Sequence, residues 1–454
     1  MLEPNLISYK DSAARVVKEG ELYFRYISNE YKEEYNHLMN SGLYDELTKL
    51  GYLITHKEVQ NDSSDTSAYK KIEPLQIEFQ SYPFEWSYNQ WRNALWVYLR
   101  INIIALRYGM ILKDGTPYNF YFQYGNPIMF DTTSFIFFKE NDPWIAYRQL
   151  CEEFFSPVTL MYYNGPQWSK ITMSHISGLP LDFVSKQLPI KSWLKLDVLL
   201  NIHLHANYLN KGTKNKKSKG FTLEKIKSLH LLMLNAIKGR KKPLSLKNHW
   251  VNYYDENIES EKYLAHKEEI VRHWLKKIAP KDILDLGANT GNFSFIAAEY
   301  ADKVIALESD IYCIDLINKK NQEEKKNVYT ALGQITEPNP TLGFQYGEIN
   351  SIENRVISHT VLNLGLSHHL YFTYKLSFKQ LAEYSATVCK NHLIIEFISS
   401  FDNKVKLITT PFSKSPVNYT IEEFIKSFDQ YFTLEENLKV LDSHRTLLLF
   451  KKLA

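Results

Sequence analysis

The chain has 454 residues, a formal net charge of +3 and 44% hydrophobic residues. At about one domain per 100–200 residues this length indicates two to four domains with large cores, and the composition excludes a disordered or fibrous chain. The small net charge argues against a protein that binds nucleic acid through its overall charge. The three cysteines are widely separated, so we expect neither a disulfide framework nor a cysteine-based zinc site. This use of cysteine is typical of a cytoplasmic protein, and we expect a cytoplasmic location.

The sequence contains no apolar run of ~18 residues, the length that crosses a bilayer as a helix. The best candidate, residues 93–106, contains Arg100 and Asn102. The amino-terminal sequence MLEPNLISYK lacks the basic and apolar regions of a signal peptide. We therefore expect neither a membrane span nor secretion.

The first 210 residues predict a mixture of strands and helices, with a polar surface loop over residues 60–67. In chain order the predicted elements are a hairpin over 16–24 that turns near Gly20, a helix over 31–50, a strand over 77–86 and a long apolar helix over 89–108.

Three polar residues follow the long helix at a distinctive spacing: Asp114, Asn119 and Asp131. The Asp-x-x-x-x-Asn pattern resembles the catalytic loop of protein and small-molecule kinases, in which the first Asp is the base and the Asn and second Asp hold magnesium. The resemblance implies an α+β, kinase-like amino-terminal domain, with ATP and Mg²⁺ at these three residues.

Other kinase features are missing from this half. The first hairpin has one glycine, the residues before Asp114 are Leu112 and Lys113 rather than His and Arg, and Arg25 is the cation that the hairpin offers in place of the usual lysine. A degenerate kinase-like domain, used for contacts or substrate presentation, is therefore expected in preference to an active phosphotransferase.

No metal site is predicted. His203 and His205 have i, i+2 spacing, which on a helix points the two rings apart. No zinc cluster, P-loop or nucleophile elbow is found in the sequence, which argues against a metalloenzyme, a P-loop NTPase and a serine hydrolase.

A basic connector follows, over residues 211–249, with a short amphipathic helix inside it. Residues 201–250 contain eleven Lys and one Arg but a single acid, Glu224. A solvated linker is the expected interpretation. The alternative is a surface for an anionic or protein partner, formed by Lys214, Lys216, Lys217 and Lys219. Nucleic acid is not the expected ligand, because aromatic residues are sparse there.

The remaining residues, 250–454, alternate apolar strands with helices and predict an α/β domain with a largely parallel sheet. The predicted strands are 282–286, 303–307, 355–364 and 392–397, and the helices between them include 292–301 and 375–388. Residues 420–423 form a capping-box sequence that starts a later helix. A final pair of strands is predicted to form an antiparallel hairpin at the sheet edge.

The segment from Asp282 to Phe293 reads as a strand, a turn of small residues and the start of a helix. Gly287 allows a sharp turn and a close approach to a ligand. Asp285 ends the first strand and Glu308 ends the next, where an acid can accept hydrogen bonds from both ribose hydroxyls of a nucleoside.

The turn lacks the third glycine of G-x-G-x-x-G, and Asp285 would repel a pyrophosphate while suiting an ammonium group. It resembles motif I of class I S-adenosylmethionine-dependent methyltransferases, D-x-G-x-G-x-G, with Asn289 at the middle glycine. The alternative is a Rossmann-like domain that has lost its ligand. The cofactor-binding residues that the resemblance implies are Asp285, Gly287, Ala288, Asn289, Gly291, Glu308 and Gln334.

Two further groups of residues fall near the expected site of methyl transfer. His368 and His369 follow the fourth strand, where an imidazole could take a proton from an acceptor, so they are the candidate catalytic residues. The candidate acceptor-site residues are Tyr253, Tyr254, Lys267 and Glu396.

The combination of a kinase-like half and a methyltransferase half is similar to bacterial two-part methyltransferases of the nodulation-protein-like type. The resemblance implies an S-adenosylmethionine-dependent methyltransferase whose acceptor is a hydroxyl or amine of a small molecule, a glycan or a lipid precursor. Two alternatives stay open. One is a bifunctional kinase and methyltransferase, and the other is a kinase-like module that binds a protein partner.

Overall fold

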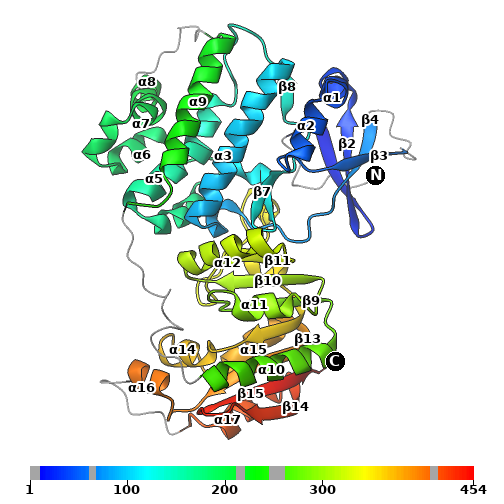
Figure 1. Cartoon of the computed structure of the whole chain (residues 1–454), viewed down its shortest axis with the longest axis vertical. Coiled ribbons are helices and arrows are strands. Elements are labelled where there is room, and N and C mark those ends of the chain that lie inside the picture. Colours follow the sequence, from blue (N-terminus) through cyan, green and yellow to red (C-terminus); the bar gives the residue numbers. More distant parts are fainter. Residues whose placement is uncertain (1–10, 61–67, 211–219, 245–260, 410–417, 454) are drawn as a thin grey trace. The chain divides into compact units, whose positions relative to one another are not determined.

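The computed structural model describes residues 11–60, 68–210, 220–244, 261–409 and 418–453 (Figure 1). The chain forms two compact units. The first contains Met1–Lys247 and Gly343–Glu348, and the second contains Asn248–Leu342 and Ile349–Ala454. Within the described residues, no helix is both long and apolar enough to cross a membrane.

The first unit begins with a four-stranded antiparallel sheet in the order β1-β2-β4-β3. Its strands are β1 Ala14–Glu19, β2 Leu22–Ser28, β3 His56–Val59 and β4 Ala68–Pro74. The predicted hairpin is confirmed, with Gly20 in the turn at φ +62°. The helix predicted over 31–50 is two helices, α1 Lys32–Asn40 and α2 Leu43–Lys49, because Gly42 adopts φ +91° between them.

The core of this unit is organised by α3 Tyr88–Ala105, which confirms the long apolar helix. The Ser87 side chain caps it by accepting a hydrogen bond from the Gln90 amide. Helix α9, Leu223–Gly239, lies beside α3 (Figure 1) and buries Ile226, Met233 and Ile237. This helix was expected in a connector, but its apolar face makes it part of the first unit.

The strand predicted over 77–86 is wrong. Residues 83–85 form a short 3₁₀-helix instead, because Pro83 has no amide hydrogen for a sheet and the Glu85 carboxylate accepts from the Tyr82 amide at 2.8 Å.

The rest of the first unit consists of two small ladders and several short helices. The ladders pair β5 Met110–Leu112 with β8 Phe135–Phe137, and β6 Phe120–Gln123 with β7 Asn126–Met129. The helices are α4 Tyr147–Gln149, α5 Ser156–Asn164, α6 Leu181–Gln187, α7 Leu196–Val198 and α8 His205–Asn210, with π-helical turns at Leu150–Phe155 and Leu199–Leu204.

The second unit contains a seven-stranded sheet in the order β11-β10-β9-β12-β13-β15-β14. Its strands are β9 Asp282–Leu286, β10 Lys303–Glu308, β11 Val328–Leu332, β12 Ser358–Asn363, β13 Cys389–Ile398, β14 Phe432–Lys439 and β15 Arg445–Lys452. The first five run parallel, and β15 pairs antiparallel with β13 and β14. The predicted α/β fold and its terminal antiparallel pair are confirmed.

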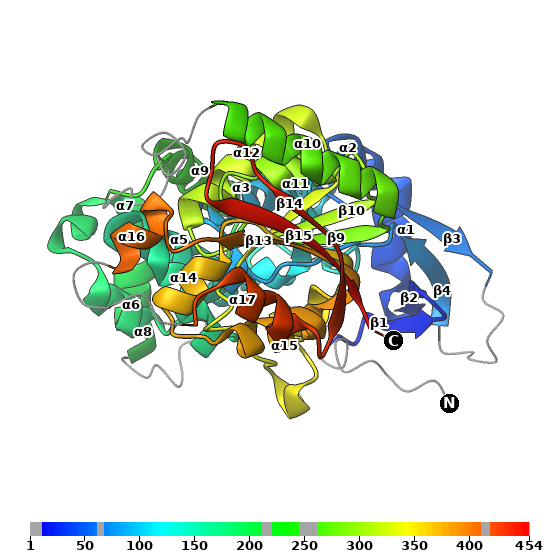
Figure 2. The same cartoon turned by 90° about the horizontal axis from the view of Figure 1, so that it is seen from below.

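Helices cover both faces of this sheet, with α10 and α11 on one face and α15 and α17 on the other (Figure 2). The helices are α10 Glu261–Ile278, α11 Asn292–Ala297, α12 Ile311–Glu324, α13 Ile352–Arg355, α14 Ser367–Phe372, α15 Phe378–Val388, α16 Asn403–Thr409 and α17 Ile421–Phe428. Thr420 caps α17 as predicted, since its Oγ1 accepts from the Glu423 amide at 3.3 Å. Strand β10 lies on one side of β9 in the sheet, and β12 lies on the other, so the strand order reverses direction at β9. A crevice is expected at such a switch point, beyond the carboxyl ends of β9 and β12.

Candidate functional site

The turn after β9 has the backbone that its residues suggested. Gly287, Asn289 and Gly291 all adopt positive φ, at +71°, +49° and +84°. Asn289 therefore takes the left-handed conformation that an asparagine can adopt in place of glycine. The Gly287 and Ala288 amides both donate to the Leu307 carbonyl, at 2.9 and 3.2 Å, which ties the turn to the end of β10.

Glu308, at the end of β10, lies directly against this turn. Its Oε2 accepts a hydrogen bond from the Asn289 amide at 2.7 Å, and its Oε1 accepts from the Ser309 and Asp310 amides at 2.6 and 2.8 Å. Burial raises the pKa of Glu308, although the hydrogen bonds from these backbone amides oppose the rise. A carboxylate oxygen has two lone pairs, so Oε2 can accept one further hydrogen bond.

Asp285, at the end of β9, is almost fully buried. Its Oδ2 accepts from the Ser294 hydroxyl at 2.6 Å, and Oδ1 accepts no hydrogen bond from the described residues. Burial raises the pKa of Asp285 to about 6, and the nearby Glu308 charge adds to the rise. A cationic ligand would stabilise the ionised form of this carboxylate.

Gln334, the remaining candidate for the cofactor, follows β11. Its side-chain Nε2 donates to the Thr336 hydroxyl at 2.8 Å, and its backbone carbonyl accepts from the Glu337 amide at 3.1 Å. The described contacts therefore tie Gln334 to its own loop.

The loop after β12 carries the two candidate histidines at the start of α14. His368 is fully buried, and neither of its ring nitrogens has a hydrogen-bond partner among the described residues. The ring centroids of His368 and His369 are 4.1 Å apart. Burial lowers the pKa of His368 well below its usual value and the pKa of His369 to about 4, so both rings are neutral at pH 7.

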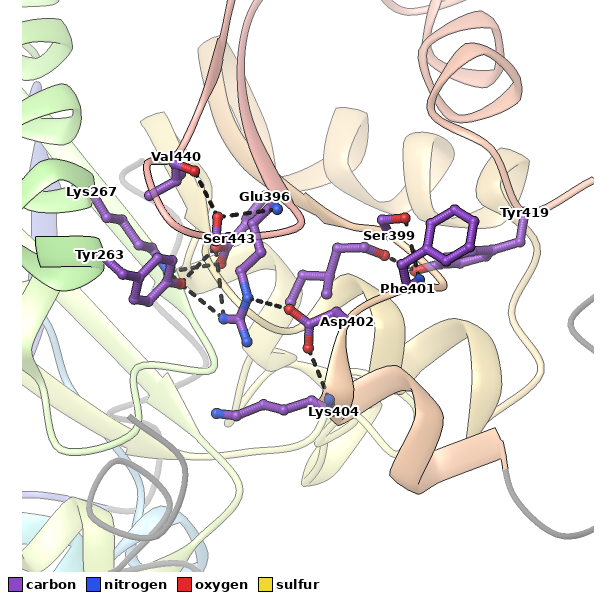
Figure 3. Close-up of polar contacts among 12 residues, drawn as sticks. Tyr263, Lys267, Glu396, Ser399, Phe401, Asp402, Lys404, Tyr419, Val440 and Ser443 are labelled. Carbon is purple, nitrogen blue, oxygen red and sulfur yellow. Dashed lines mark hydrogen bonds and ion pairs between the residues drawn. The ribbon is translucent and has the colours of Figure 1, made fainter. Parts of the chain in front are cut away.

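Lys267 and Glu396, two of the predicted acceptor-site residues, contact each other (Figure 3). The Lys267 Nζ lies 2.7 Å from Glu396 Oε2, and both side chains are buried. Burial would raise the pKa of Glu396, but Lys267 and Arg445 lower it below its usual value. Glu396 is therefore an ionised carboxylate inside the protein.

Three residues that the sequence did not indicate complete this network (Figure 3). The Tyr263 hydroxyl donates to Glu396 Oε1 at 2.9 Å and accepts from Arg445 Nη1 at 2.8 Å. Arg445 Nε donates to Asp402 Oδ2 at 3.0 Å. The i, i+4 spacing of Tyr263 and Lys267 on one helix was the signal available in the sequence, since it places both side chains on the same face.

In the first unit, the structure also brings together the residues of the kinase-like pattern. Asn119 Nδ2 lies 3.4 Å from Asp131 Oδ2, and the Ser134 hydroxyl donates to Asp114 Oδ2 at 3.0 Å. Burial raises the pKa of Asp114 to about 6, and the Asp131 charge contributes. The guanidinium of Arg25 forms an ion pair with Asp131.

The remaining residues that the sequence analysis singled out either fall outside the described residues or belong to the core. Tyr253, Tyr254 and the connector lysines Lys214, Lys216, Lys217 and Lys219 fall outside the described residues. His203 accepts or donates hydrogen bonds to Ser185 and Ser192, at 2.7 and 2.8 Å, as part of the core. Over the described ranges, no group of three His, Cys, Asp or Glu side chains could hold a metal ion.

Comparison with known proteins identifies one curated relative, and no family model matches the chain. The nodulation protein NoeA of Rhizobium meliloti (strain 1021) is 25% identical over 385 residues, which cover 83% of this chain and 80% of that protein.

Many solved structures overlap with part of the chain, and two serve as examples. The N-methyltransferase NodS from Bradyrhizobium japonicum WM9 is 10% identical with a TM-score of 0.32, over 43% of this chain and 99% of NodS. The magnesium protoporphyrin IX methyltransferase ChlM from Synechocystis PCC 6803 is 14% identical with a TM-score of 0.33, over 44% of this chain and 91% of ChlM.

Proposed function

We propose that the second unit is an S-adenosylmethionine-dependent methyltransferase whose acceptor is a hydroxyl or amine of a small molecule, a glycan or a lipid precursor. One observation carries the proposal. Asp285 and Glu308 lie at the carboxyl ends of two neighbouring parallel strands, and the turn from Gly287 to Gly291, which has positive φ at three of its residues, connects to the first of them.

The donor and acceptor groups of this turn fit the cofactor. Asp285 Oδ1 accepts no hydrogen bond from the described residues, so this oxygen can bind an ammonium group. Glu308 Oε2 has a lone pair left for a ribose hydroxyl. A Cβ added at Gly287 would lie 3.2 Å from the Leu366 side chain, so the glycine allows the turn to approach Leu366 this closely. Ala288, Asn289 and Gly291 supply the surrounding backbone, and Gln334 is proposed at the adenine edge.

The bound cofactor would supply a methyl group on a sulfonium, which an acceptor displaces in line. The chain positions the reacting groups and removes the proton of the acceptor. We assign this proton to the unprotonated ring nitrogen of His368, because the buried ring is neutral and its nitrogens have no protein partner among the described residues. His369 is the second candidate for the same role.

Lys267 and Glu396 are proposed as a wall of the acceptor site. A Cβ added at Gly365, in the loop after β12, would lie 3.6 Å from Glu396 Oε2, so this carboxylate reaches the same end of the sheet as the histidines. The buried network fixes α10 against β13 and β15 at this end.

Calorimetric titration of the full chain with S-adenosylhomocysteine tests the proposal. We expect binding by the native protein and at least tenfold weaker binding by Asp285→Ala and by Glu308→Ala. Glu299→Gln is a matched control on the same unit, because Glu299 forms a half-exposed ion pair with Arg272 away from the turn. No heat with the native protein, or equal affinity in all variants, would reject the methyltransferase assignment.

The first unit is proposed as a degenerate kinase-like domain. The observation that favours it is the contact between Asn119 and Asp131, together with the nearby charge of Asp114. The same cluster also bears on whether this domain uses a metal.

A further inference from the structure

Asp131, the residue that the kinase-like pattern assigns to a metal, already has four hydrogen-bond donors. Its Oδ1 accepts from the Arg25 guanidinium, from the Thr133 amide at 3.0 Å and from the Thr133 hydroxyl at 2.8 Å. Its Oδ2 faces Asn119 Nδ2 at 3.4 Å. The oxygen that would bind a metal is therefore occupied by a cation and two further donors.

The Arg25–Asp131 pair is also well shielded from water. The two side chains are 12% and 10% exposed, and the residues are 106 positions apart in the chain. Burial would raise the pKa of Asp131, but Arg25 and Thr133 hold it below its usual value. Asp131 is thus ionised, with its charge balanced by the guanidinium.

The neighbouring charges are paired as well. Lys113 Nζ lies 2.9 Å from Asp11 Oδ1, and the Thr133 hydroxyl lies 3.2 Å from Asp11 Oδ2. Asp114 accepts from Ser134 and is the acid in this cluster whose pKa is raised, to about 6.

Magnesium does not fit this arrangement. It requires nearly octahedral oxygen ligands at roughly 2.0–2.1 Å, and its two positive charges would lie beside the guanidinium. We propose that Arg25 is the resident cation of the Asp114–Asn119–Asp131 cluster and that the cluster binds no divalent cation while Arg25 is present. Removing the guanidinium would leave Asp131 Oδ1 with the two Thr133 donors alone and its charge unbalanced, which would open a latent metal site formed by Asp131 with Asn119 or Asp114.

Without a metal ion at this cluster, the first unit would not carry out metal-dependent phosphoryl transfer. Kinase chemistry depends on metal ions at these positions to neutralise the transferred phosphate. Arg25 lies on β2 and Asp131 follows β7, so the same ion pair fastens the four-stranded sheet to the β6–β7 hairpin.

Manganese is a suitable probe, because it accepts the same oxygen ligands as magnesium and its free form is measured by electron paramagnetic resonance. The full chain is titrated as native protein, Asn119→Ala, Arg25→Gln, Arg25→Lys and the double variant Arg25→Gln/Asp131→Asn. We expect native protein and Asn119→Ala to bind equal amounts. Arg25→Gln should bind one additional Mn²⁺ at least tenfold more tightly than any native site, and the double variant should lose it.

The conservative Arg25→Lys keeps the positive charge and should bind no additional ion. Manganese binding by the native protein that falls in Asn119→Ala would overturn the proposal, as would a folded Arg25→Gln without an additional ion. Folding is checked by circular dichroism. If Arg25→Gln does not fold, the comparison of native protein with Asn119→Ala decides the matter.

Discussion

Lys267 and Glu396 are 129 residues apart in the chain, and their side chains form a buried ion pair with a 2.7 Å contact. The pair joins α10, which precedes the sheet, to the end of β13, inside the sheet. Charged groups at this depth are stable only while both partners are present.

The first prediction concerns this pair. Glu396→Gln and Lys267→Met should each lower the free energy of unfolding by about 3–5 kcal/mol, because each removes the closest charged partner of a buried charge. The double variant should lose clearly less than the sum of the two. Urea denaturation followed by circular dichroism measures all three. Additive losses would show that the two side chains are not coupled.

Asp285 should make stability depend on pH. Its folded pKa of about 6 lies above the unfolded value of about 3.9, so the folded state binds the proton more tightly and stability falls as pH rises from about 4 to about 6. Asp285→Asn should therefore stabilise the free protein by about 2–3 kcal/mol at pH 7 and have little effect at pH 4.

Thermal and urea unfolding at the two pH values check this expectation. The same variant should lose affinity for S-adenosylhomocysteine, so stability and binding should change in opposite directions. A variant that is less stable at pH 7 would contradict the pKa assignment.

Gly287 offers a test of the turn. Gly287→Ala places a side chain at φ +71° and 3.2 Å from Leu366, so we expect a loss of about 1–2 kcal/mol from the backbone and a further loss from the contact. Gly20→Ala is the matched control, because Gly20 has φ +62° and open space around it. A larger loss at Gly287 than at Gly20, together with weaker cofactor binding, is the expected result of the urea and calorimetric measurements.

His368 provides a kinetic prediction. With a labelled methyl donor and a cell extract as the source of acceptor, His368→Asn should reduce methyl incorporation by about 10²–10⁴-fold and leave cofactor binding unchanged. Because burial lowers the pKa of His368, the rate of the native protein should stay level between pH 6 and 8 and fall only in more acidic solution. Equal incorporation by His368→Asn and the native protein would remove this histidine from the reaction.

Local patterns in the sequence predicted the parts of the fold that depend on local chemistry. The strand Asp282–Leu286 was predicted with its observed bounds, and the Thr420 cap and the Asn289 turn follow from residues within a few positions of each other. Strand β4 was missed, since its sequence AYKKIEP does not alternate. The buried Lys71 in this strand pairs with Glu19, 2.8 Å away in another strand.

In the candidate site, too, the sequence predicted the residues that a local motif marks but not their distant partners. The carboxylates at the strand ends are marked by the motif, but the partners of Glu396 come from α10 and β15, far away in the chain. Arg25 could be considered as a cation from the sequence, whereas its pairing with Asp131 requires the sheet to pack on the β6–β7 hairpin. Contacts of this range are set by the tertiary fold rather than by neighbouring residues.

The position of β15 has a consequence for how the protein is made. Although β15 is synthesised after β13 and β14, it lies between them in the sheet and contributes Arg445 to the buried network. While the chain emerges from the ribosome, β13 therefore presents an unpaired edge until residues 445–452 have been translated. Closure of the sheet is a late event in biogenesis, and a nascent chain stalled before Arg445 would be a natural client for chaperones.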